Sequence, residues 1–158
     1  STMPWTFEGK LDILENKTLR YSGHWEWMKA YRELGLFSED SVKVGNVEIT
    51  PREFYHHLLD LKINDGDVKD VCLMRVECKG IKDGNPVVST VVSVEYFDKE
   101  TGFTAMEKWT GWHASIMAIQ IAEGKIPSGA YPVEKAMTGQ SFLDEANKRN
   151  YNIQISTN

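Results

Sequence analysis

The most informative stretch of this chain is Thr18-Leu19-Arg20-Tyr21-Ser22-Gly23-His24-Trp25-Glu26-Trp27-Met28-Lys29. Loosely alternating residues over 11–21 predict a strand that carries the cation of Arg20 near its end. Gly23 then indicates a turn, and His24 follows it. The apolar side chains that come next recur at helical spacing: Trp27, Tyr31 and Leu34. We therefore expect a strand, a turn and a helix, with Gly35 as the residue that ends the helix.

Working outward, the rest of the chain predicts further helices and an antiparallel sheet. Thr50-Pro51, with Glu53, is typical of a helix start, and residues 64–67 have the composition of the turn that ends this helix. Alternation over 70–82 and 86–98 predicts a hairpin with one polar face. We also expect a strand at 103–109, a helix at 111–123 buried on most sides, a helix at 139–149 and a strand at 151–155.

This order of elements predicts the α+β class, with a mostly antiparallel mixed sheet and helices packed on one face. A length of 158 residues fits one domain over residues 1–158. The predicted elements do not alternate as βαβ units, and the sequence contains no Gly-x-Gly-x-x-Gly motif. The residues therefore give no sign of a dinucleotide-binding fold.

Composition excludes several classes of partner. The net charge of −5 argues against nucleic acid and against an anionic membrane surface, and no run of eighteen apolar residues could span a bilayer. Cys72 and Cys78 lie six residues apart in one predicted strand, roughly 20 Å, which is too far for a disulfide. Two free, buried thiols are typical of a reducing compartment, so we expect a cytoplasmic protein.

Two segments could form a binding site. Arg20 could hold a substrate carboxylate with its planar, two-pronged guanidinium, and His24 would face the same cleft. The alternative is a surface arginine and a histidine near a helix terminus. At the second segment, Thr110 and Gly111 would begin a helix whose free N–H groups attract an anion, with His113 two residues further on. Here the alternative is ordinary helix capping by Thr110.

The sequence gives little support for a metal-binding site or for a catalytic nucleophile. His56 and His57, with Glu53 and Asp60, put at most two ligands on each helix face, whereas a closed metal site usually needs four. In the predicted strand both cysteines point away from the face of Arg75 and Lys79, so no basic side chain would lower the pKa of either thiol, and there is no nucleophile-elbow motif. We predict no metal site and no covalent catalysis.

The stretches Trp5–Lys10 and Thr18–Lys29, with Thr110-Gly111 and the segment from Pro132 to Tyr151, resemble the carboxy-terminal substrate domain of the saccharopine dehydrogenase and lysine dehydrogenase family. In that family a Pro-Gly-His turn usually stands where this chain has Ser22-Gly23-His24. The resemblance implies that Arg20, Tyr21 and Gly23 bind the substrate and that His24 is catalytic. It implies the same binding role for Thr110, Gly111 and, on the helix flank, His113.

The resemblance also implies an oxidoreductase that acts on the C–N bond of an amino acid or opine-type amine with NAD or NADP. An amino-terminal Rossmann domain would hold that cofactor, so we expect this fragment to lack that domain and to bind none alone. The resemblance further implies a homodimer, for which we expect an edge strand or the outer sheet face, with Val87, Val91 and Phe97 beside Arg75, Glu77 and Lys79. A non-catalytic small-molecule-binding or dimerisation module is the competing interpretation.

Overall fold

The computed structural model describes residues 1–63 and 68–158, and these form two compact units. One unit consists of residues 1–6 and 68–158, and the other of residues 7–67. The predicted turn at 64–67 lies outside the described residues. Helices account for 38% of the described residues and strands for 23%, and both sheets in this part of the chain are antiparallel, which confirms the α+β class.

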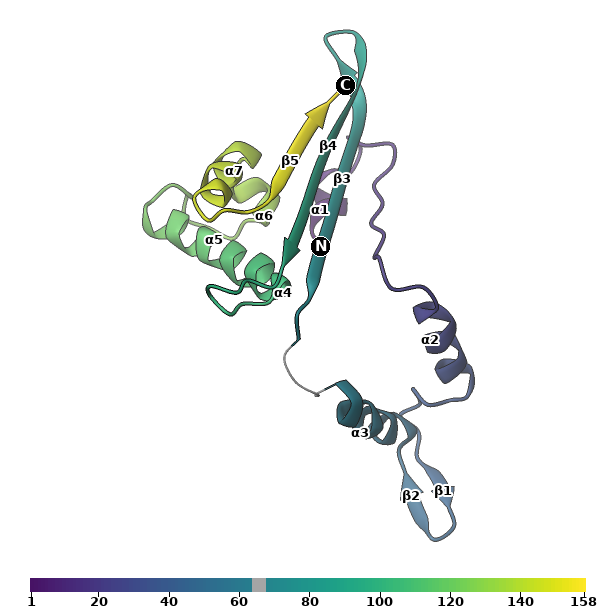
Figure 1. The fold of residues 1–158 in the computed structure, drawn as a ribbon. Coiled ribbons are helices and arrows are strands. Elements are labelled where there is room, and N and C mark those ends of the chain that lie inside the picture. The colour runs from purple at the N-terminus through teal and green to yellow at the C-terminus, as the bar shows by residue number, and fades with distance from the viewer. Residues whose placement is uncertain (64–67) are drawn as a thin grey trace. The chain divides into compact units, whose positions relative to one another are not determined.

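The larger unit is built on a three-stranded antiparallel sheet in the order β3-β4-β5 (Figure 1). Its strands are β3 (Val71–Lys82), β4 (Asn85–Tyr96) and β5 (Ile153–Thr157). The predicted hairpin is confirmed, with Lys82 paired to Asn85 across a two-residue turn. Both turn residues have positive φ, 52° at Asp83 and 81° at Gly84, as the Asp-Gly pair favours in tight hairpins.

Helices of this unit are grouped beside the sheet (Figure 1). They are α1 (Met3–Thr6), α4 (Ala105–Glu107), a π-helical turn (Lys108–Trp112), α5 (His113–Ala122), α6 (Val133–Ala136) and α7 (Gly139–Asn147). Thr138 caps α7 by accepting a hydrogen bond from the Ser141 N–H at 3.1 Å. The core lies between α5, α7 and β5 around Ile116, Ala146 and Tyr151.

The register of β3 and β4 shows which side chains share a face of the sheet. Ser93 and Glu95 are buried, and Ile153, paired with Ser93, packs against the helical core; this face is therefore the covered one. On the other face Arg75, Glu77 and Lys79 pair with Val92, Thr90 and Val88. Val87 and Val91 alternate with those residues and lie on the opposite face, so the prediction that they join this charged row was wrong.

The smaller unit contains α2 (His24–Glu33), the hairpin of β1 (Val42–Val44) and β2 (Val47–Ile49), and α3 (Pro51–Ile63). Both predicted helices are confirmed, and Gly35 has φ 85° with its N–H bonded to the Arg32 carbonyl, as a helix-ending glycine should. Tyr55 packs against Tyr31 and Phe37 at ring distances of 5.8 and 5.0 Å. Within residues 7–63 no side chain is fully buried.

Two predicted strands are absent from the described residues. Residues 11–21 form no strand, because extended backbone becomes a strand only where another strand takes its hydrogen bonds, and these residues belong to neither sheet of the described residues. Residues 103–109 instead contain the start of a helix. The helix expected from Gly111 is therefore part of a longer helical run, and α5 is less covered than predicted, since Ile119 and Ile121 are exposed.

The cysteines are both free, and Cys72 and Cys78 both lie in β3 as expected. Their predicted burial was wrong for Cys78, which is exposed, because it lies toward the hairpin end of β3. Burial raises the pKa of the Cys72 thiol, and the charges of Asp70 and Glu95 raise it further. The Cys72 thiol is therefore held in its protonated, poorly nucleophilic form.

Candidate functional site

The turn that precedes α2 explains the glycine in the first candidate segment. The N–H of His24 donates to the carbonyl of Tyr21 at 3.1 Å, and Gly23 has φ 85° and ψ −12°. These angles are those of the third residue of a type II turn, which strongly favours glycine. A Cβ on Gly23 would lie 3.7 Å from Trp27 Nε1, an ordinary contact, so backbone conformation rather than space demands glycine. Proline favours the preceding position of such a turn, and Ser22 occupies it here.

The Arg20 side chain is exposed in the smaller unit. In the part of the chain that the structure describes, its hydrogen bond goes to the Leu19 carbonyl, from Nη1 at 2.9 Å. Tyr21 is 89% exposed, and the His24 ring meets the Trp25 ring edge-on at 5.2 Å. Arg20, Tyr21, Gly23 and His24 thus lie together around one turn. Arg20 leaves an irregular segment, not the strand end that the sequence predicted.

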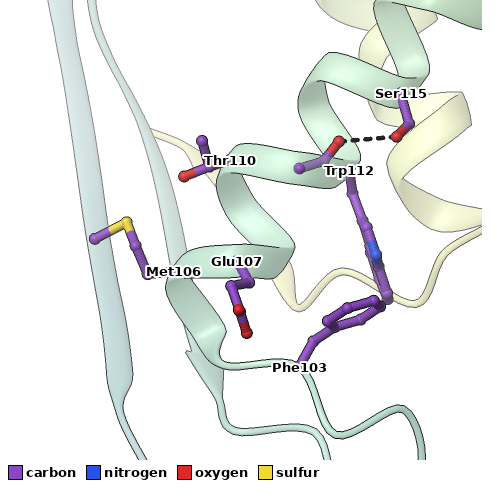
Figure 2. A pocket seen from close by; sticks show the side chains of 7 residues that line it. Phe103, Met106, Glu107, Thr110, Trp112 and Ser115 are labelled. Carbon is purple, nitrogen blue, oxygen red and sulfur yellow. Dashed lines mark hydrogen bonds between the residues drawn. The ribbon is translucent and has the colours of Figure 1, made fainter. Parts of the chain in front are cut away.

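The second candidate segment lines a hollow of about 550 Å³ in the larger unit. Figure 2 shows its lining: Phe103, Met106, Glu107, Thr110, Gly111, Trp112 and Ser115. Thr110 and Gly111 belong to the π-helical turn, a feature that is rare and frequently found at functional sites. The Ser115 hydroxyl donates to the Gly111 carbonyl at 2.9 Å (Figure 2). The structure thus brings two predicted residues into one hollow.

The helical run that carries Thr110 begins at Thr104, not at Thr110. Thr104 and Glu107 form a reciprocal capping box, with bonds of 3.1 Å from the Glu107 N–H and 2.8 Å from the Thr104 N–H. The Asp70 carboxylate accepts the N–H groups of Ala105 and Met106 at 2.6 and 2.9 Å. Protein groups therefore already accept the hydrogen bonds of the N–H groups at the start of this run. The prediction that a helix starting at Thr110 would offer free N–H groups to an anion was wrong, because the helical run begins earlier.

His113 lies outside the lining of this hollow. Its ring packs against Phe142 of α7 at 5.6 Å, as a histidine on a helix flank commonly does. The other lining residues were not expected from the sequence: Phe103, Met106, Glu107, Trp112 and Ser115. The Thr104-x-x-Glu107 pattern was a usable signal, because a threonine followed three residues later by glutamate is typical of a helix start.

A second hollow of about 580 Å³ lies next to the first and shares Trp112 with it. Its polar lining includes Glu95, Lys108, Arg149 and Asn152. Glu95 and Lys108 form a buried ion pair, with Oε2 and Nζ 2.9 Å apart and exposed fractions of 6% and 9%. The two hollows therefore share one indole ring as part of their walls, and a buried cation lies beside that ring.

Two titratable groups near this second hollow have strongly shifted pKa values. Burial, and next the charge of Glu95, raise the pKa of Tyr151 to about 12, so its hydroxyl stays protonated and donates to the Lys108 carbonyl at 2.8 Å. Hydrogen bonds from Lys148 and then Arg149 lower the pKa of Glu145 to about 2, so that this carboxylate stays ionised. Neither group would exchange a proton near neutral pH.

No three His, Cys, Asp or Glu side chains come together as metal ligands in residues 1–63 and 68–158. Over the same ranges, no helix has both the length and the apolar character that crossing a membrane requires.

A family model described as "Saccharopine dehydrogenase C-terminal domain" matches residues 4–151. This chain belongs to that family. The match extends over residues of both units and includes the Arg20–His24 turn as well as the Thr110–Ser115 side of the hollow. The resemblance inferred from the sequence is thus confirmed, and the chain is a domain of a dehydrogenase family.

Proposed function

We propose that this saccharopine dehydrogenase C-terminal domain binds the substrate of an oxidoreductase that acts on the C–N bond of an amino acid or opine-type amine. The observation that carries the proposal is the Arg20–His24 turn, which lies inside the family match and presents an exposed guanidinium beside an exposed phenol. Arg20 would hold the substrate carboxylate with two parallel hydrogen bonds. His24 would exchange a proton with the substrate, and Tyr21 would contact it.

Thr110 and Gly111 would contact the substrate from the mainly apolar hollow of the larger unit, and His113 from the flank of α5. Aromatic rings at Phe103 and Trp112 suit the methylene groups of an amino-acid side chain or an opine.

The residues that the structure describes do not fit a nicotinamide dinucleotide. Both sheets are antiparallel, whereas the dinucleotide fold needs parallel strands joined through a glycine-rich turn and a helix. NAD or NADP would therefore be held by another domain, and this chain would contribute only to substrate binding.

The proposed activity is tested with the whole cytoplasmic protein that carries this chain. L-lysine, saccharopine and related opines would each be supplied with NAD or NADP, and reduced nicotinamide would be followed by its absorbance. We expect turnover that depends on one member of this amine series. A protein that binds these amines without reducing either nicotinamide would favour the non-catalytic module instead, as would a coding sequence with no strand, Gly-x-Gly-x-x-Gly turn and helix upstream of Ser1.

The chain on its own is expected to have no measurable affinity for NAD or NADP and no dehydrogenase activity. Its described residues offer no phosphate-binding turn of the dinucleotide type. Calorimetric titration of the isolated chain with each nucleotide measures this directly. Micromolar binding of either nucleotide would contradict the assignment of the cofactor to another domain.

We also propose that the chain forms a homodimer through the uncovered face of the three-stranded sheet. Val71, Leu73 and Tyr96 share that face and are 41%, 53% and 65% exposed. Beyond them, Glu77 pairs with Arg75 at 2.6 Å and with Lys79 at 3.0 Å, so one of the two cations is offset within the chain. A partly apolar face with exposed large side chains suits a second copy of itself.

Leu73→Lys is expected to weaken this dimer, because it would place two like charges near each other across a symmetric interface. Light scattering over a range of protein concentrations measures the change in mass. Val76→Lys, which changes an exposed apolar residue of β3 on the opposite face of the sheet, is the matched control. A wild-type chain that stays monomeric at high concentration would overturn the dimer.

A further inference from the structure

Trp112 occupies an unusual position, because it lines both hollows of the larger unit. In Figure 2 its ring stands next to that of Phe103 at the edge of the first hollow. Lys108 Nζ lies 4.9 Å from the centre of the Trp112 ring, within the range of a cation–π contact. A displacement of this indole would therefore change the walls of both hollows.

Lys108 is itself held by a carboxylate whose other oxygen is fixed to the backbone. Glu95 Oε2 accepts from Lys108 Nζ at 2.9 Å, and Glu95 Oε1 accepts from the Asn152 N–H at 2.6 Å. Glu95 lies on β4, the central strand of the sheet, so it is a rigid anchor. The sheet thereby fixes the ammonium group that faces Trp112.

Tyr151 provides a second connection to the same turn. Its hydroxyl donates to the Lys108 carbonyl at 2.8 Å, and its ring meets the Trp112 ring edge-on at 5.5 Å and 88°. Lys108 is the first residue of the π-helical turn that ends at Trp112. Both ends of this turn, and with them Thr110 and Gly111, are tied to the core.

We propose that Glu95 and Lys108 are positioning residues: the ion pair fixes Trp112 against the hollow and so sets the affinity of the hollow for substrate. The part that concerns substrate rests on the proposed function. Stability alone does not explain why an ion pair is buried here, because apolar residues of similar volume are often as stabilising as a buried ion pair. The pair does explain how the Trp112 ring is held in one position at the wall of the hollow.

The test uses the double variant Lys108→Met with Glu95→Gln, which leaves no unpaired buried charge and keeps the length of both side chains. Tryptophan in the whole protein would be replaced by 5-fluorotryptophan, and the ¹⁹F resonance of Trp112 would be assigned by its loss in Trp112→Phe. We expect this resonance to shift or broaden in the double variant. Lys148→Met, which removes an exposed partner of Glu145, is the control and should leave the resonance in place.

Steady-state kinetics of the double variant distinguishes a role in positioning Trp112 for substrate binding from a role in core packing alone. Loss of the cation beside Trp112 should raise the KM for the amine substrate by roughly two- to thirtyfold, with kcat within about twofold of wild type. An unchanged Trp112 resonance would overturn the inference, and so would a moved resonance with unchanged KM. If the wild-type protein reduces no nicotinamide with any amine, the proposed function fails, and the resonance by itself then decides whether Glu95 and Lys108 position Trp112.

Discussion

Arg20→Ala is expected to raise the KM of the full enzyme for its amino-acid substrate strongly while the fold survives. The loss of a charge-assisted, two-pronged pair with the substrate carboxylate should remove roughly 2–4 kcal/mol of transition-state binding. The fold should survive because Arg20 is exposed and its hydrogen bond in the described structure is to the neighbouring Leu19 carbonyl. Steady-state kinetics gives the effect, and circular dichroism is the control for folding.

Two further variants sharpen this test of the Arg20–His24 turn. Arg20→Lys should recover only part of the loss, because an ammonium is a point charge without the planar fork. His24→Ala should affect binding less and should alter the pH profile of kcat/KM if the imidazole moves a proton. An Arg20→Ala enzyme with unchanged kcat/KM would make Arg20 an ordinary surface residue and remove it from the site.

Glu95→Ala is expected to give the largest loss of stability among single changes in the larger unit. It would leave the Lys108 ammonium buried without its partner and the Asn152 N–H without its acceptor. Breaking a buried ion pair on one side typically lowers the free energy of unfolding by about 3–5 kcal/mol. Chemical denaturation followed by circular dichroism measures the change.

The matched control is Glu77→Ala, which breaks an ion pair on the uncovered face of the same sheet. Arg75 and Lys79, the partners of Glu77, are 68% and 71% exposed, so this change should lower stability far less than Glu95→Ala. Equal losses in the two variants would mean that the Glu95–Lys108 pair behaves like a surface pair and has no special place in the core.

Much of the local structure was determined by short sequence signals. Asp83-Gly84 has the two positive φ angles that a tight hairpin needs. Thr50 directly precedes a helix that begins at Pro51, as the Thr-Pro pair predicts. Gly23 and Gly35 likewise adopt the positive φ that only glycine takes readily. The β1–β2 hairpin was missed although Gly45-Asn46 between alternating valines is also a hairpin signal, since the apolar run is short.

Residues 103–112 could not be predicted from their own alternation, because the group that fixes their structure comes from elsewhere. Asp70 lies 35 residues before Ala105, and its carboxylate completes the helix start that Thr104 and Glu107 begin. Without that distant acceptor, the sequence of Phe103–Trp109 is equally compatible with a strand. The hollow around Thr110 and Gly111 exists only because this segment is helical.

The sequence by itself determined the family, the fold class and the residues around the Arg20–His24 turn, because motif, turn and helix-end signals act over a few residues. Tertiary structure alone decided that Glu95 and Lys108, thirteen residues apart, would be buried together and that Trp112 would stand between two hollows. In the sequence Glu95 and Lys108 look like two solvated charges. Burial of a charge is tolerated only where another element brings its partner, and that is a property of the assembled sheet and helices.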